Sequence, residues 1–253
     1  MKKTWRGFNI ALIITLWAGI VSAGEPMPRI LFDQGHDQRF LIGEKGKLQL
    51  SKLADIIRSQ GAVVTATSSP LSDDTLRGVA ALVISGPFET LQPEELAAVV
   101  RFVERGGHLA AMLHVGPPLA SLLDRLDIDH SNAVLHERSN VIDKGTNFTV
   151  KDLSPNPLFA GISRFSVYGG WALKAGKNGA PLAHTSAEAW VDLDGDKALS
   201  KNDAVGVFDV VVAGSLGAGR FIIFGDDAIF QNRYLDENNR NLAANLAAWL
   251  RER

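Results

Sequence analysis

The chain of 253 residues contains no cysteine. Disulfide bonds and thiolate metal sites are therefore excluded. So is every enzyme class whose nucleophile is a thiol, including cysteine proteases and thiol-dependent amidotransferases. If the protein is exported, burial of its core and any bound metal must hold the fold together, because no covalent cross-link can do so.

Long apolar runs are also scarce. Residues 8–21 form an apolar run that is too short for a spanning helix, which needs roughly 20 residues. Three basic residues lie within the first six positions, and the run ends at the small residues 21–23, which is the pattern of a secretory signal peptide. We therefore expect residues 1–23 to be a cleaved signal peptide, with an uncleaved membrane anchor as the alternative. The mature chain would be periplasmic or secreted and would contain no membrane span.

Charge of either sign is not in large excess. The formal net charge is −2, and residues 1–23 contain three basic residues and no acidic one, so the mature chain would have a charge of −5. A weakly acidic balance gives no support to nucleic acid or an anionic membrane surface as the partner. A small molecule, a glycan and an envelope protein remain open as partners.

Patterns of buried strands alternate with patterns of amphipathic helices. Apolar runs predict strands at residues 29–33, 62–66, 81–85, 108–113 and 220–224. Helical spacing predicts helices over residues 48–59, 90–105, 119–126 and 237–251. Continuous apolar strands between helices are typical of parallel sheets covered on both faces. The sequence therefore predicts an α/β fold with a flavodoxin-like, doubly wound and mainly parallel sheet.

Residues 128–212 have a different pattern. Their segments are short and β-like, with turn signals at Pro155-Asn-Pro157, Asn178-Gly179 and Asp194-Gly195. We expect antiparallel strands that are added to the same sheet. Because no linker rich in Ser, Pro and Gly separates this region, residues 24–253 are predicted to form one domain.

Polar side chains follow several of the predicted strands. The candidates are Asp33, His36, Arg39, Ser85, His114, Asp226 and Asp227. Because the carboxyl ends of parallel strands meet at one edge of a sheet, we expect these side chains to form a ligand cleft. A histidine beside a carboxylate can act as a general base or orient a ligand. The alternative is that the same groups cap helices and bind loop amides.

Ser85 invites comparison with the nucleophile of a serine hydrolase. The segment Val83-Ile-Ser-Gly-Pro87 lacks the first glycine of the strained turn that carries such a serine. The sequence therefore gives a serine hydrolase only weak support.

An acidic segment spans residues 192–203. Its carboxylates at positions 1, 3, 5 and 12 are Asp192, Asp194, Asp196 and Asp203. This is the spacing by which a calcium loop surrounds one ion with oxygens, and the carbonyl of Ala198 stands at position 7. Calcium is therefore the cofactor that the segment predicts. Lys197 occupies position 6, where such loops place glycine, and the flanks have strand character, so the alternative is a solvated hairpin turn at Asp194-Gly195.

Motifs in a fixed order cover most of residues 29–253. They are Ile30-Leu-Phe-Asp33 with His36, Leu82-Val-Ile-Ser-Gly-Pro87, Leu91-x-Pro-Glu-Glu-Leu96 to Gly106-Gly107, and Gly219-Arg220 through Gly225-Asp226 to Asn232, Asn239 and Trp249-Leu250. Together they resemble the class I glutamine amidotransferase-like superfamily. The likeness is to its bacterial branch of uncharacterised domains related to the auxiliary subunit of gliding-type ABC transporters.

A second likeness is to trehalose-utilisation-type domains. It rests on Gly106-Gly107 followed by His114 and on Pro157-Leu-Phe-Ala-Gly-Ile162. These resemblances imply the fold and a cleft at the sheet edge. They do not imply amidotransferase activity, because the catalytic members use a cysteine that this chain lacks.

The sequence favours an exported, non-thiol amidotransferase-like domain that acts as a binding or accessory module of the cell envelope. One alternative is a hydrolase that acts on a carbohydrate or ester through the His/Asp sheet edge. Another is a structural partner of an envelope complex. A catalytic edge would pair a histidine of strongly perturbed pKa with a nucleophile or metal, whereas a binding module needs only a polar concavity.

Overall fold

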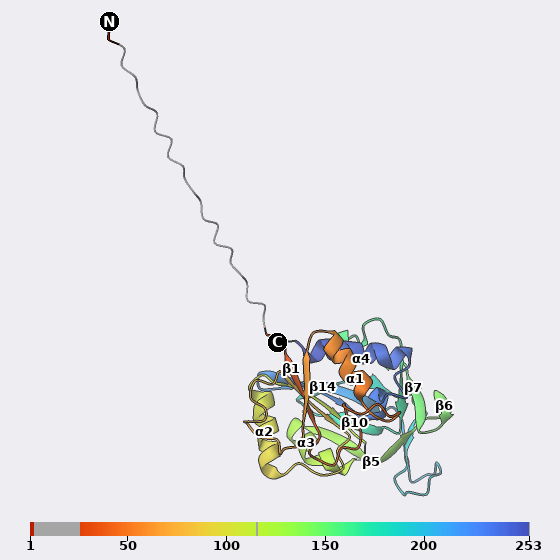
Figure 1. Cartoon of the computed structure of the whole chain (residues 1–253). Helices are drawn as coiled ribbons and strands as arrows, with labels where there is room; N and C mark the ends of the chain where they lie inside the picture. Colours follow the sequence, from red (N-terminus) through yellow and green to blue (C-terminus); the bar gives the residue numbers. More distant parts are fainter. Residues whose placement is uncertain (3–25, 115, 253) are drawn as a thin grey trace.

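A computed structural model describes residues 1–2, 26–114 and 116–252 (Figure 1). Nearly all of the expected signal peptide, residues 1–23, lies outside the described residues, so its cleavage stays a prediction. Within the described part of the chain, no helix combines the length and the apolar character needed to cross a membrane.

Five parallel strands form one side of the main sheet. In spatial order they are β15 (Gly219–Phe224), β4 (His108–Met112), β3 (Ala81–Ser85), β1 (Arg29–Asp33) and, at the edge of the sheet, β2 (Val63–Thr67). All residues of β3 and β4 are buried, as expected for continuous apolar runs in a sheet covered on both faces. The predicted parallel core is confirmed.

Antiparallel strands extend this sheet beyond β15. Those in its main path are β14 (Asp209–Leu216), β10 (Trp171–Ala175), β5 (Ile128–His136), β12 (Trp190–Val191) and β13 (Ala204–Val205). A branch adds β11 (Gly179–His184) and β8 (Asp152–Leu153), giving twelve strands among the described residues. A separate sheet contains β6 (Val141–Lys144), β7 (Asn147–Val150) and β9 (Phe165–Tyr168). The flavodoxin-like fold with added antiparallel strands is confirmed.

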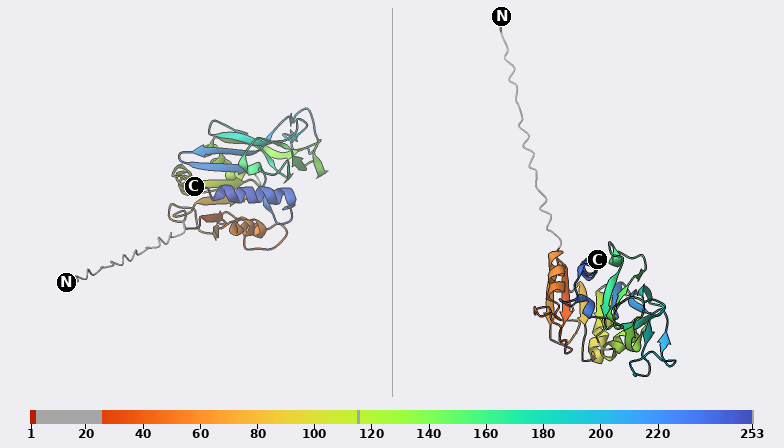
Figure 2. Two further views of the ribbon diagram at one scale, coloured as in Figure 1. Left: turned by 90° about the horizontal axis from the view of Figure 1, so that it is seen from above. Right: turned by 90° about the vertical axis from the view of Figure 1, so that its right-hand side faces the viewer.

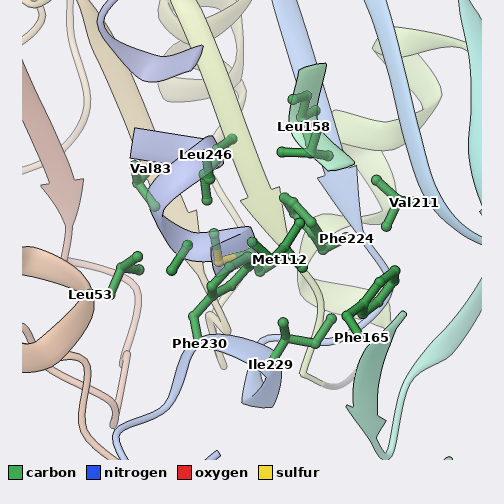
Figure 3. Close-up of a cluster of buried hydrophobic side chains, with 14 of the residues drawn as sticks. Leu53, Val83, Met112, Leu158, Phe165, Val211, Phe224, Ile229, Phe230 and Leu246 are labelled. Carbon is green, nitrogen blue, oxygen red and sulfur yellow. The ribbon is translucent and has the colours of Figure 1, made fainter. Parts of the chain in front are cut away.

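Helices cover both faces of the parallel strands (Figures 1 and 2). They are α1 (Ser51–Ser59), α2 (Pro93–Glu104), α3 (Ala120–Leu126) and α4 (Glu237–Leu250), with short 3₁₀ turns η1 (Pro117–Leu119), η2 (Pro157–Phe159) and η3 (Ala228–Phe230). Successive residues of a strand point to opposite faces of the sheet and therefore belong to two different apolar clusters. Val83 belongs to the cluster that includes residues of α1 and α4, whereas Leu82 belongs to the cluster that includes residues of α2 and α3. Figure 3 shows part of the first cluster, which includes Leu53, Val83, Met112 and Leu246.

Helix α2 begins three residues later than predicted, and its first turn matters for the site. Gln92 precedes Pro93 in an extended conformation, and Gln92 and Glu95 form a reciprocal capping box. The Glu95 carboxylate therefore lies at the start of the helix, on its buried side, close to the carboxyl edge of the sheet.

Candidate functional site

The strand register places the predicted residues along one sheet edge. Asp33 and Ser85 are the last residues of β1 and β3, and His114 and Asp226 follow β4 and β15. Their side chains, however, separate into groups with different partners. The expectation of one cleft formed by all seven residues is therefore corrected, because Asp33 and His36 pair with each other and with Glu95, whereas His114 pairs with Asp227.

The first group is an internal ion-pair cluster. His36 Nδ1 lies 2.8 Å from Asp33 Oδ2, and His36 Nε2 lies 3.2 Å from Glu95 Oε2. The side-chain amide of Gln38 also donates to Asp33. Burial disfavours the charged imidazole, but the hydrogen bonds and charges of Asp33 and Glu95 outweigh it and raise the pKa of His36 to about 9. With both ring nitrogens occupied and only 4 % of the residue exposed, His36 is a structural residue and not a ligand of the cleft.

This cluster fixes the loop of residues 34–40. Glu95 also accepts the backbone N–H of Leu71 at 2.9 Å, and the carbonyl of His36 accepts the N–H of Phe88 at 3.0 Å. Three separate loops are thus tied to the start of α2. Glu95 was not among the residues predicted from the sequence, although an acidic residue on the apolar face of a predicted helix is a detectable signal.

The second group is centred on His114. Its Nδ1 lies 2.9 Å from Oδ1 of Asp227, whose carboxylate is fully buried. The hydrogen bond to Asp227 raises the pKa of His114, while burial raises the pKa of Asp227 above its usual value. The His114 side chain is 32 % exposed, and among the described residues its Nε2 has no hydrogen-bond partner. A buried carboxylate therefore orients a histidine whose second nitrogen is free for a ligand.

Aromatic and cationic side chains surround His114. Its ring centroid lies 5.0 Å from that of Phe40 and 5.1 Å from that of Phe88, and the guanidinium carbon of Arg39 lies 4.4 Å from the Phe88 centroid. We call these four residues the His114 patch. The sequence predicted His114 and Arg39 but neither phenylalanine, and both phenylalanines lie in the two loops that the ion-pair cluster ties together.

Asp226 has a different role from its neighbour. Its carboxylate accepts the backbone N–H groups of Tyr168 at 2.6 Å and of Ala228 at 2.9 Å. Burial, and then the charge of Asp227, raise the pKa of Asp226 to about 7. Asp226 therefore fixes the backbone beneath the patch and does not present its carboxylate to solvent.

Ser85 is buried and takes no part in a catalytic triad. Its Oγ has no hydrogen-bond partner among the described residues, and neither has Oδ2 of Asp227. Gly86 follows with φ of +55°, and a Cβ there would overlap Oδ2 of Asp227. Glycine is therefore required at this turn both for its backbone conformation and for the space that the Asp227 carboxylate occupies.

The acidic loop brings three of its four carboxylates together. Oxygens of Asp192, Asp194 and Asp196 lie within 4.8 Å of one another. Lys197 has φ of +63°, so it adopts the left-handed conformation that calcium loops assign to glycine at position 6. The presence of Lys197 instead of glycine at position 6 is therefore a weaker argument against a calcium loop.

The predicted ligand Asp203 has another role, whereas the role predicted for the Ala198 carbonyl stays a prediction. Asp203 lies outside the group of three, and its oxygens accept the N–H groups of Leu193 at 2.9 Å and of Ser200 at 2.6 Å. The N–H of Ala198 donates to Asp196 at 2.8 Å. The predicted convergence of Asp203 on the same centre is corrected, because its carboxylate closes the loop by capping backbone amides.

Calcium binding by this loop stays a prediction, with a measurable effect on stability. A weak extracellular-type site at millimolar calcium would stabilise the fold by about 1–3 kcal/mol. For a domain of this size we expect the thermal midpoint to rise by roughly 3–10 °C relative to a chelator. Asp194→Ala should abolish the rise, and Asp143→Ala, on the exposed strand β6, should retain it. Equal midpoints with calcium and chelator in the wild type would leave only a solvated turn.

Most of the chain matches a known protein family. Residues 44–247 match the family described as Domain of unknown function (DUF4350). The chain belongs to the DUF4350 family. No curated protein sequence matches it.

Solved structures show the fold of this DUF4350 protein. The mmIFT52 N-terminal domain is similar with a TM-score of 0.71 and 18% identity, over 88% of this chain and 98% of that one. A putative ThuA-like protein from Bacteroides uniformis ATCC 8492 is similar with a TM-score of 0.52 and 13% identity, over 88% of this chain and 91% of that one. The β-galactosidase from Rahnella sp. R3 is similar with a TM-score of 0.55 and 13% identity, over 88% of this chain and 30% of that one. These likenesses agree with an amidotransferase-like, ThuA-like fold, and the relation to the gliding-type transporter subunit stays a prediction.

Proposed function

We propose that this DUF4350 protein is an exported accessory module of the cell envelope that binds a glycan at the His114 patch. The observation that carries the proposal is the Asp227–His114 pair, in which a buried carboxylate orients a partly exposed imidazole whose ring lies 5.0 and 5.1 Å from the partly exposed rings of Phe40 and Phe88. Export is supported by the signal-like pattern of residues 1–23.

Binding is favoured over hydrolysis by the surroundings of His114. Its Nδ1 is occupied by Asp227, and Ser85, the serine candidate from the sequence, makes no hydrogen bond to it. A Ser-His-Asp triad requires a hydroxyl within hydrogen-bond reach of the imidazole. The described side chains therefore provide an oriented donor or acceptor for a ligand without an adjacent hydroxyl nucleophile.

A glycan fits the composition of the patch. Phe40 and Phe88 are partly exposed and offer apolar surface to the C–H groups of a sugar, while Arg39 and His114 offer polar groups to its oxygens. The similar part of the Rahnella β-galactosidase is one portion of a longer carbohydrate enzyme, which supports a fold that is used alongside carbohydrate chemistry.

The test is calorimetric titration of residues 24–253 with a panel of neutral and acidic oligosaccharides. We expect His114→Gln to weaken binding about 10-fold or more, as for loss of a hydrogen bond to a charged group. The matched control is His184→Gln, because His184 Nδ1 lies 2.9 Å from Asp209 in a similar pair away from the patch. Equal affinities for wild type and His114→Gln would contradict the proposal. Release of new reducing ends by the wild type but not by His114→Gln would replace it with the hydrolase.

A further inference from the structure

We infer that the His114 patch selects glycans that carry a carboxylate, such as uronic acid sugars, and that Arg39 and His114, which both contact the Phe88 ring, hold the carboxylate. This inference rests on the proposed function and specifies its ligand class. It is carried by the contacts of two cationic or cation-forming side chains with one aromatic ring.

Arg39 is available for an external anion. Its side chain is 63% exposed, and its only carboxylate partner among the described residues is Asp37, 3.3 Å away and 50% exposed. Exposed pairs of this kind contribute little, so a ligand carboxylate can replace Asp37 at small cost. The planar guanidinium suits a carboxylate because it can donate two parallel hydrogen bonds.

His114 supplies the second donor. The buried Asp227 carboxylate holds Nδ1, and its charge favours the protonated ring, in which Nε2 carries a hydrogen. The donor is therefore already oriented before a ligand arrives, and the loss of side-chain freedom on binding is reduced.

The nearby acidic groups do not cancel this preference. Asp226 and Asp227 are buried and bound to N–H groups or to His114. Glu89 is exposed, and no hydrogen bond of its side chain to the patch is present among the described residues. The groups of the patch that can donate to an anion are thus Arg39 and His114, with Phe40 beside them to pack against the sugar ring.

The test compares trigalacturonate with its methyl ester, which keeps the sugar rings and removes the charge. By calorimetry we expect the wild type to bind the acid about 10-fold or more tightly than the ester. Arg39→Gln should reduce affinity for the acid by a similar factor and reduce affinity for the ester much less. The control Arg58→Gln removes another exposed arginine, on α1, and should leave both affinities unchanged.

Equal binding of acid and ester, with both weakened in His114→Gln, would overturn the carboxylate selection and keep the patch as a glycan site. Unchanged affinity of Arg39→Gln for the acid would also overturn it. Absence of binding of either probe to the wild type would overturn the inference, while the proposed function would then be decided by the neutral members of the wider panel.

Discussion

Replacement of Glu95 by glutamine is expected to lower the free energy of unfolding by about 3–5 kcal/mol, as for removal of one partner from a buried ion pair. Glu95 binds His36 Nε2 and accepts backbone N–H groups from two loops, so the substitution leaves a buried charged histidine with weaker compensation. Urea unfolding of residues 24–253 measures the effect as a shift in midpoint with an unchanged slope.

The control for this substitution is Asp74→Asn. Asp74 pairs with Arg77 on the surface, where both side chains are about four-fifths exposed, so less than about 1 kcal/mol should be lost. Equal and small effects of Glu95→Gln and Asp74→Asn would show that the ion-pair cluster does not stabilise the fold.

The same cluster gives a defined pH dependence. Because the pKa of His36 is raised from 6.5 to about 9, its contribution to stability is fully present below pH 6.5 and is lost as the pH rises through 9. The pKa of Glu95 is lowered, so its contribution is present above its usual value of 4.5 and is lost as the pH falls below it. The alkaline loss should be much smaller in His36→Gln.

Gly86→Ala is expected to have the second large effect, on stability and on ligand binding together. The left-handed backbone should cost about 1–2 kcal/mol and the contact of the new Cβ with Asp227 about 1–3 kcal/mol more. If the Asp227 carboxylate moves to relieve that contact, the imidazole of His114 loses its orientation. We therefore expect unfolding at lower urea and weaker glycan binding by the folded fraction.

Substitutions at two other glycines separate the cost of the left-handed backbone from the cost of the contact with Asp227. Gly78 has φ of +69°, and a Cβ at this position would have nothing within 4 Å, so Gly78→Ala reports the backbone cost alone. Gly43 is exposed, has no such φ and has equally free space, so Gly43→Ala should be nearly neutral. If Gly86→Ala cost no more than Gly78→Ala and bound ligand normally, the proposed packing against Asp227 would be wrong.

The parallel core was predictable because four of its five strands are continuous and mostly buried apolar runs, while the fifth, the edge strand β2, is rich in β-branched residues. The last residues of β1 and β3 were therefore placed correctly at the sheet edge. The partners at that edge were not predictable, since His36 and Glu95 are 59 positions apart and pair only after α2 packs on the sheet. Hydrophobic periodicity predicts which face of a strand or helix is buried, but it does not predict which side chains that face contacts.

The aromatic part of the site was missed for a similar reason. Phe40 and Phe88 lie in loops without periodicity, and their approach to His114 depends on the backbone bond between His36 and Phe88. Ser85 was an open candidate because sequence shows residue type and spacing but not burial. In the structure its Oγ is enclosed and unbonded within the described part of the chain.

The decisive measurement is histidine side-chain NMR of ¹⁵N-labelled residues 24–253 during titration with trigalacturonate. If the patch is the ligand site, the Nε2 resonance of His114 shifts in a saturable manner, and the resonances of His184 stay constant. The resonance of His114 is assigned by its absence in His114→Gln. Saturable calorimetric binding of trigalacturonate that leaves the His114 resonance unmoved would place the ligand elsewhere and contradict a glycan site at this edge of the sheet.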